Sequence, residues 1–260
     1  MLIRIVTQSV VFGYFLFVLG CSTTEVVNEH RNYTNTEKAR MVVEIANGAL
    51  AEGDPVGALQ HLVRAEAFDN EIPELYHSKA LAFFMRQDLD NALRAARRAV
   101  ELKPNYSDAN NTLGKLLMDA GQYPEAELKL QLAANDVLYR DAYKAQTNLG
   151  ILHYKNGRNE VAQKYFDRAI AGSPNTACVA YYFRGNIELK NSELKKAIES
   201  YTLATQKTCA QFVDAQFALG LAYSKSGQIP LAKQTFLEIQ KRYPKHALAE
   251  KALEQLRFLP

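Results

Sequence analysis

The sequence has no tryptophan, and only 13 glycines and 8 prolines stand among its 260 residues. So few helix-breaking residues favour a helical protein. The 31 basic residues are interspersed with 28 acidic ones and form no basic stripe, which argues against a surface that binds nucleic acid. Hydrophobic residues make up 48% of the chain, enough to bury a sizeable core.

No run of apolar residues near the N-terminus is long enough to span a membrane. Spanning takes about 20 consecutive apolar residues, and polar residues at positions 7–9 interrupt this stretch early. A single positive charge at Arg4, followed by an apolar segment at 10–19, is typical of an export signal. The sequence therefore predicts a signal peptide at residues 1–20.

The residues that close this signal, Val-Leu-Gly-Cys at 18–21, resemble the lipobox of bacterial lipoproteins. The resemblance implies cleavage before Cys21 and acylation of Cys21. Ser22 stands where aspartate would mark inner-membrane retention, so the expected location is the periplasmic face of the outer membrane. An ordinary secretory signal and an uncleaved anchor remain the alternatives. Residues 21–36, polar and without apolar periodicity, predict a lipidated flexible tether.

One pattern recurs about every 34 residues over the rest of the chain. Each unit carries a small residue at its eighth and twentieth places, and most carry one at the twenty-seventh, where two helices can then approach closely. The spacing resembles the tetratricopeptide repeat, although the tryptophan of that family is missing from the fourth place of every unit. The predicted fold class is an all-α solenoid superhelix within residues 37–260. Its six repeats and one capping helix are expected at 39–72, 73–106, 107–142, 143–176, 178–211, 213–246 and 247–258.

Helix-breaking residues mark the turns of these predicted hairpins, as in Gly53-Asp54-Pro55 and Gly121-Gln122. The third unit is two residues longer than the others, which predicts a longer turn near residues 135–143. No single hairpin buries its apolar face alone, so stacking must create a continuous core that the capping helix closes.

Catalytic signatures are missing from the sequence. The five histidines lie in different units without metal-ligand spacing, and no glycine-rich phosphate loop or nucleophile elbow is present. We therefore expect no enzymatic activity, no cofactor, no metal and no small-molecule substrate. His153 occupies an aromatic place of the repeat, which predicts a packed ring.

Cys178 and Cys209 begin and end the fifth unit, at its first and thirty-second places. The antiparallel helices of a hairpin bring these places together, and the periplasm permits oxidation. We predict a disulfide between them, with two buried thiols as the alternative.

A protein partner is expected on the concave face, which in this architecture is lined by the first helix of each unit. Counting its inward places gives a predicted partner groove of Asn47, Leu50, His77, Leu81, Phe84, Met85, Asn111, Lys115, Ile151, Tyr154, Tyr182, Asn186 and Phe217. The same count also gives Val43, Met118, Thr147, Leu189 and Leu221. Large apolar residues at 81, 84 and 85 indicate a contact surface; packing on the adjacent repeat or on the tether is the alternative.

A lipobox followed by six such repeats resembles the pilotins of the type IV pilus. A stretch of about 35 residues adds to the likeness through Ala133, Ala134, Asp136, Leu138, Tyr139, Asn148-Leu149-Gly150, Ala162, Tyr165 and Phe166. The resemblance implies a lipid-anchored assembly factor that binds secretin subunits and promotes their localisation and multimerisation. A scaffold lipoprotein for peptidoglycan hydrolases or for outer-membrane assembly is the competing interpretation.

Overall fold

The computed structural model describes residues 32–260, and its helices lie within one compact unit, Tyr33–Pro260. The predicted export signal and Cys21 fall outside the described residues. The described part is entirely helical, with thirteen α-helices and one short 3-10 helix. None of these helices combines the length and the apolar character needed to cross a membrane.

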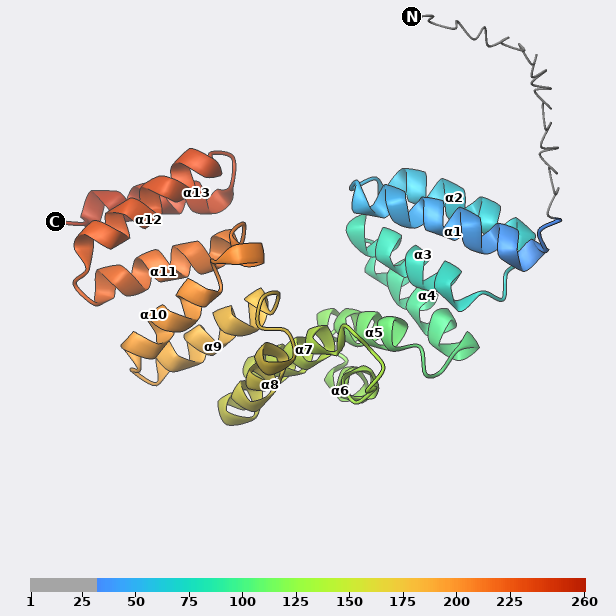
Figure 1. Cartoon of the computed structure of the whole chain (residues 1–260), viewed down its shortest axis with the longest axis horizontal. Helices are drawn as coiled ribbons and strands as arrows, with labels where there is room; N and C mark the ends of the chain where they lie inside the picture. The colour runs from blue at the N-terminus through green and yellow to red at the C-terminus, as the bar shows by residue number, and fades with distance from the viewer. Residues whose placement is uncertain (1–31) are drawn as a thin grey trace, which may run out of the picture. The chain divides into compact units, whose positions relative to one another are not determined.

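The helices form six antiparallel hairpins and a final single helix, in the order predicted from the repeats (Figure 1). Each hairpin packs on the next, and first helices also contact each other, as α1 does with α3 and α5 with α7. The bounds are α1 (Asn35–Ala51), α2 (Pro55–Phe68), α3 (Pro73–Met85), α4 (Leu89–Leu102), α5 (Ser107–Asp119), α6 (Tyr123–Ala134), α7 (Ala142–Lys155), α8 (Asn159–Gly172), α9 (Cys178–Lys190), α10 (Leu194–Leu203), η1 (Lys207–Cys209), α11 (Val213–Lys225), α12 (Ile229–Arg242) and α13 (Ala247–Phe258).

The first helix begins at Asn35, four residues before the first predicted unit and inside the predicted tether. The cause is a capping box: Thr34 Oγ1 accepts a hydrogen bond from the Glu37 backbone N–H at 3.2 Å, and the Thr34 N–H donates to the Glu37 carboxylate at 2.8 Å. These bonds satisfy two backbone donors at the helix start. Residues 35 and 36 therefore belong to α1 and not to the predicted tether.

The small residues sit where the two helices of a hairpin come closest. Alanines at the twentieth place of all six units are fully buried, as are those at the twenty-seventh place of the first five. A Cβ added to Gly150 would lie 2.4 Å from the Phe166 ring, and one added to Gly220 would lie 2.6 Å from the Phe236 ring. The pattern that predicted the fold thus marks places where a large side chain of the second helix lies against the backbone of the first, as Leu130 does at Gly114 and Phe166 at Gly150.

Each hairpin turn contains one residue with positive φ. Glycine occupies this place in four hairpins, but Gln87 has φ 61° and Ser192 has φ 65°. A side chain in this region of backbone space costs free energy, so these two turns are held by the helices on either side.

The capping helix α13 closes the last hairpin, with Leu248 and Leu256 packed against the cluster around Phe236. Two other apolar side chains of α13 are exposed to solvent, Leu253 at 41% and Phe258 at 77%. The predicted longer turn is found as the connection at residues 135–141, between α6 and α7.

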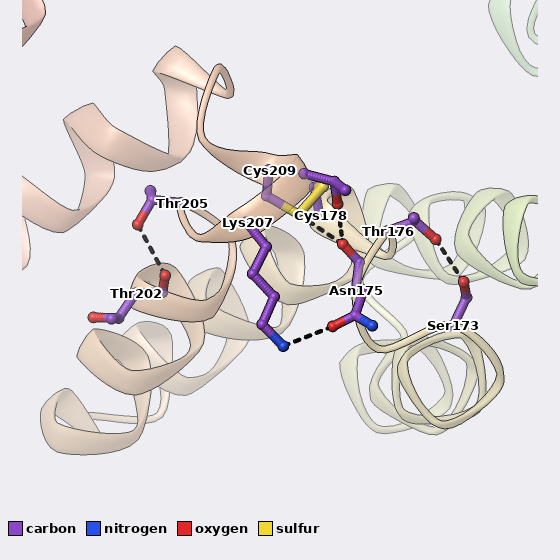
Figure 2. The surroundings of a disulfide bond; sticks show 9 residues. Ser173, Asn175, Thr176, Cys178, Thr202, Thr205, Lys207 and Cys209 are labelled. Carbon is purple, nitrogen blue, oxygen red and sulfur yellow. Dashed lines mark hydrogen bonds between the residues drawn. A yellow bond between two sulfur atoms is a disulfide. The ribbon is translucent and has the colours of Figure 1, made fainter. Parts of the chain in front are cut away.

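A disulfide joins Cys178 at the start of α9 to Cys209 in η1, with Cα atoms 5.4 Å apart (Figure 2). It fastens the connection at residues 204–212 to the preceding connection at 173–177. Hydrogen bonds from Lys207 Nζ and Thr208 Oγ1 to Asn175 reinforce the same junction. The disulfide therefore joins the two ends of the fifth repeat, and the hydrogen bonds to Asn175 join the fifth repeat to the fourth.

Removing this disulfide is expected to destabilise the fifth and sixth repeats. Closure of a loop of about 30 residues is worth roughly 3 kcal/mol in a chain-entropy treatment. The double substitution Cys178→Ser/Cys209→Ser should lower the Tm by several degrees, as measured by circular dichroism. Mass spectrometry of non-reduced peptides checks the bond directly, and two free thiols would contradict it.

Candidate protein-binding groove

A groove of about 560 Å³ lies along the first helices of the second to fifth repeats. Side chains from α3, α5, α7 and α9 line it, together with residues from the connections at 135–141 and 173–177. Since α3, α5 and α7 each supply several residues and α9 supplies Val179, the groove runs across the repeats and suits an elongated ligand.

One wall of the groove is apolar and carries a positive charge. Leu81 and Phe84 on α3 face Leu116 on α5, and Val179 on α9 extends the apolar surface at the far end. The Lys115 ammonium lies 4.3 Å from the centroid of the Phe84 ring. This cation–π contact holds the charge over the wall, where it remains available to an acidic or carbonyl group of a ligand.

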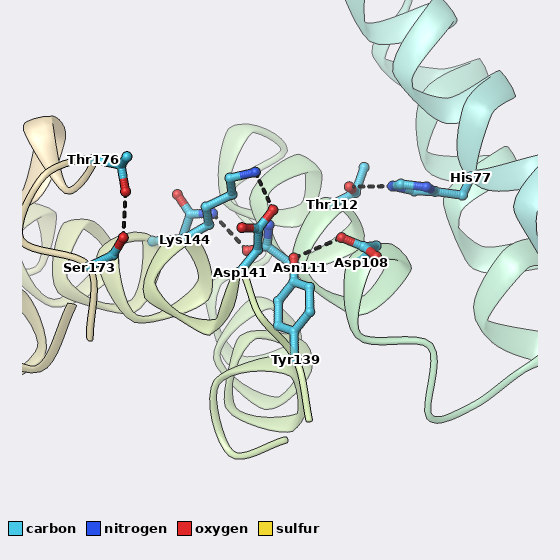
Figure 3. A network of polar contacts seen from close by, with 10 residues as sticks. His77, Asp108, Asn111, Thr112, Tyr139, Asp141, Lys144, Ser173 and Thr176 are labelled. Carbon is cyan, nitrogen blue, oxygen red and sulfur yellow. Dashed lines mark hydrogen bonds and ion pairs between the residues drawn. The ribbon is translucent and has the colours of Figure 1, made fainter. Parts of the chain in front are cut away.

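The floor is polar and bridges the repeats. Asn148 Nδ2 on α7 donates to Asn111 Oδ1 on α5 at 2.9 Å, and His77 Nε2 on α3 lies 3.0 Å from Thr112 Oγ1 (Figure 3). The amide pair keeps one N–H₂ group and one oxygen for other partners. A peptide backbone offers the complementary acceptor and donor.

The long connection between α6 and α7 forms the rim of the groove. The Tyr139 hydroxyl donates to Asp108 Oδ1 at 2.9 Å, and Lys144 pairs with Asp141 (Figure 3). Burial, together with the Asp108 carboxylate, raises the pKa of Tyr139, so its phenol stays protonated and remains a donor. The hydrogen bond between Tyr139 and Asp108 therefore fixes this connection against α5.

The groove lining is suited to binding rather than to proton transfer. Burial lowers the pKa of His77, although the Asp108 and Glu74 carboxylates oppose the shift, and the ring is neutral at pH 7. Its second nitrogen, Nδ1, lies 3.4 Å from the Tyr106 hydroxyl, so both ring nitrogens have partners. Within residues 32–260, no three His, Cys, Asp or Glu side chains are grouped to hold a metal ion.

Five residues of the predicted partner groove line the observed one: His77, Leu81, Phe84, Asn111 and Lys115. Thr147, from the wider count, joins them. Met85 is 43% exposed but lies outside this lining. The apolar residues Leu81 and Phe84 on α3 thus lie at one end of the groove.

Most of the remaining predicted residues pack within a repeat or against the adjacent repeat. Val43 and Met118 belong to the core, and Leu50 and Ile151 pack against it. Toward the C-terminus, aromatic rings occupy the inward places and pack edge-on or tilted against other rings, with centroids 5.2–5.6 Å apart for Tyr154–Phe183, Tyr182–Phe183 and Phe217–Phe236. The amide oxygens of Asn47 and Asn186 accept hydrogen bonds from Ser78 and Tyr201. Leu189 packs against the fifth-repeat core, whereas Leu221 is 37% exposed and lines no part of the groove.

The count of inward places included six of the sixteen residues that line the groove and missed the other ten. Thr112 and Asn148 lie one position beyond the counted places, and Tyr139 lies in a connection that no helical count includes. The extra length of the third unit was the available signal for the rim. His153, by contrast, is buried and stacked on Tyr165 with centroids 5.2 Å apart, as predicted.

These features define an α-solenoid with a peptide-sized groove on its first helices. Profiles of the tetratricopeptide repeat match residues 83–137, 111–177, 147–211 and 214–246, which is more than half of the chain. The chain belongs to the tetratricopeptide-repeat family. The first hairpin and α3 lie almost entirely before these matches. The first hairpin has buried alanines at the eighth, twentieth and twenty-seventh places of the repeat, and α3 has one at the eighth.

Among characterised proteins, the chain is similar to the type IV pilus assembly protein PilF of Pseudomonas aeruginosa. The two are 23% identical over 202 residues, 77% of this chain and 80% of PilF. A solved structure of P. aeruginosa PilF superposes with a TM-score of 0.71 at 18% identity, over 85% of this chain and 99% of that one. PilW, described as a widely conserved type IV pilus biogenesis factor, superposes with a TM-score of 0.72 at 19% identity, over 84% of this chain and 99% of that one.

The structural likeness alone identifies the fold and no particular role. A Cut9–Hcn1 hetero-tetramer of the anaphase-promoting complex also superposes with a TM-score of 0.72, at 17% identity, over 84% of this chain and 42% of that one. Repeat stacking produces similar coordinates in proteins of different function.

Proposed function

We propose that this protein is a pilotin, a non-catalytic outer-membrane lipoprotein that binds the type IV pilus secretin and promotes its localisation and multimerisation. The observation that carries the proposal is the alignment with PilF, which spans 77% of this chain and 80% of that assembly protein. The match is therefore to a whole protein of the same length class and not to a few shared repeats. The lipobox-like sequence that ends at Cys21 supports attachment of such a protein to a membrane through a lipid.

The groove between α3 and α9 is the proposed binding site for a secretin segment. Its apolar wall at Leu81 and Phe84 accommodates an apolar side chain, and Asn111 and Asn148 can pair with the segment's backbone. Lys115 adds attraction for an acidic group beside them. Together these groups bind an exposed polypeptide segment without any chemical step.

The role of Cys21 is tested by Cys21→Ser, which removes the acylated thiol. Acylation with several chains holds a protein durably at a membrane because each buried methylene contributes about 0.8 kcal/mol. The variant is expected to leave the outer-membrane fraction and to reduce secretin multimers there strongly. Density-gradient fractionation followed by immunoblotting of unheated samples measures both effects, and Ser22→Ala provides the matched control. A Cys21→Ser protein that stays in the outer-membrane fraction would refute the lipid anchor.

Deletion of the gene tests the function itself. The expected result is secretin monomers and cells without pili, restored by a plasmid copy of the wild-type gene. Normal secretin multimers and pili, together with altered cell-wall hydrolysis, would instead assign the chain to a hydrolase adaptor. Defective insertion of many outer-membrane proteins would assign it to general outer-membrane assembly.

A further inference from the structure

The connections between repeats share one edge of the solenoid with the start of α1. In a stack of antiparallel hairpins, every first helix begins at the same edge, and every connection leading into a first helix lies there. Contacts link neighbours along this edge: Thr36 Oγ1 on α1 donates to Asp69 Oδ2 at 2.6 Å, and Lys207 Nζ donates to Asn175 Oδ1 at 2.8 Å. We refer to it as the connection edge.

The chain leaves the connection edge toward Cys21. Eleven residues, 22–32, separate Cys21 from Tyr33, and a chain of that length reaches at most about 40 Å. If Cys21 is acylated, as in the proposed function on which this inference rests, the start of α1 on the connection edge lies within about 40 Å of the bilayer.

One connection on this edge differs from the others in chemistry. At 69–72, 103–106, 173–177 and 243–246 the exposed residues include Asn70, Asn105, Asn175 and Lys245. The connection at 135–141 instead presents Val137, which is 96% exposed, and Leu138, which is 86% exposed. We call these two residues the aliphatic tip. No other aliphatic side chain in the described residues reaches such exposure.

The aliphatic tip is held in place and is not a frayed segment. Asp136 accepts hydrogen bonds from Ser107 Oγ and, at 2.9 Å, from the Leu138 N–H. Directly after the tip, the Tyr139 hydroxyl is bonded to Asp108. The fold therefore fixes both flanks of the tip on α5 and directs two aliphatic side chains into solvent, where exposure brings no gain in stability.

We infer that the aliphatic tip inserts into the phospholipid surface and orients the solenoid on the membrane. Tyr139 lines the groove but Val137 and Leu138 do not, so the tip is free to act while the groove is occupied. Two side chains are too few for a specific protein interface, which buries about 800 Å² on each partner. A bilayer requires no shape complementarity, and the lipid anchor raises the local concentration enough for a weak contact to persist.

The test uses the full lipidated chain in vesicles of phosphatidylethanolamine and phosphatidylglycerol. Leu138→Cys provides a thiol for an environment-sensitive dye, because Cys178 and Cys209 are joined and Cys21 is acylated. The matched control is Asn105→Cys, at an exposed site on another connection of the same edge. We expect the dye at position 138 to shift its emission to the blue and to be quenched by brominated lipid, and the dye at 105 to remain unchanged.

Three other outcomes overturn the inference, each in a different way. If the protein floats with the vesicles but neither dye responds, the tip does not touch lipid, and the anchor and the pilotin role are unaffected. If the dye at 138 responds only after secretin is added, the tip is a protein contact. If the lipidated protein does not float at all, the anchor is wrong and the inference falls with it.

Discussion

Replacing Phe166 with alanine is expected to lower the free energy of unfolding by about 3–5 kcal/mol. The ring has no solvent exposure, lies against the backbone of Gly150, and stacks on Phe183 of the next repeat with centroids 5.7 Å apart. Its removal leaves a cavity between α7 and α8 that two packed helices cannot fill by moving together. Urea denaturation followed by circular dichroism measures the change.

Phe258→Ala is the matched control, because the same side chain is 77% exposed at the end of α13. This variant should stay within about 0.5 kcal/mol of the wild type. Neighbouring repeats stabilise each other, so the loss at Phe166 is expected to extend to unfolding of α9 and α10 as well. Equal losses in both variants would contradict the packing described for the fourth repeat.

The spacing of small residues was enough to predict the hairpins, because it records a direct steric requirement. A side chain at Gly150 or Gly185 would overlap the ring that faces it, so the sequence must keep these places small in every unit. The longer third unit likewise predicted the connection at 135–141. Such local constraints repeat along the chain and can be recognised without any knowledge of tertiary contacts.

The groove was only partly predictable, since exposure depends on the size of neighbouring side chains. Inward places on α9 and α11 hold large rings, and Tyr182 and Phe217 use their area to pack on adjacent helices. On α5 and α7 the corresponding places hold asparagine and threonine, which are too short to close the space. A count of helical positions treats both cases alike. The start of α1 was missed for a different reason, because the capping box at Thr34 precedes the repeat pattern.

Under the proposed function, replacing Phe84 with alanine is expected to weaken secretin binding by roughly 30-fold or more, the loss of an aromatic residue central to an interface. Phe84 forms part of the apolar wall, and its ring contacts the Lys115 ammonium. The variant therefore removes a hydrophobic contact and also releases the Lys115 ammonium from its cation–π contact. Because Phe84 also packs against the core, a stability loss of about 1–2 kcal/mol is expected. Co-purification of secretin from detergent-solubilised outer membranes measures the binding.

Met85→Ala separates the groove from the rest of the α3 surface. Met85 follows Phe84 in sequence and is 43% exposed, yet it does not line the groove, so this variant should retain secretin. Thermal unfolding of both variants shows whether the chains remain folded at the temperature of the assay. Equal retention by the folded Phe84→Ala and Met85→Ala proteins would place the secretin contact elsewhere. A selective loss in the folded Phe84→Ala protein would mean that the bound segment lies on Phe84 and the Lys115 ammonium that its ring supports.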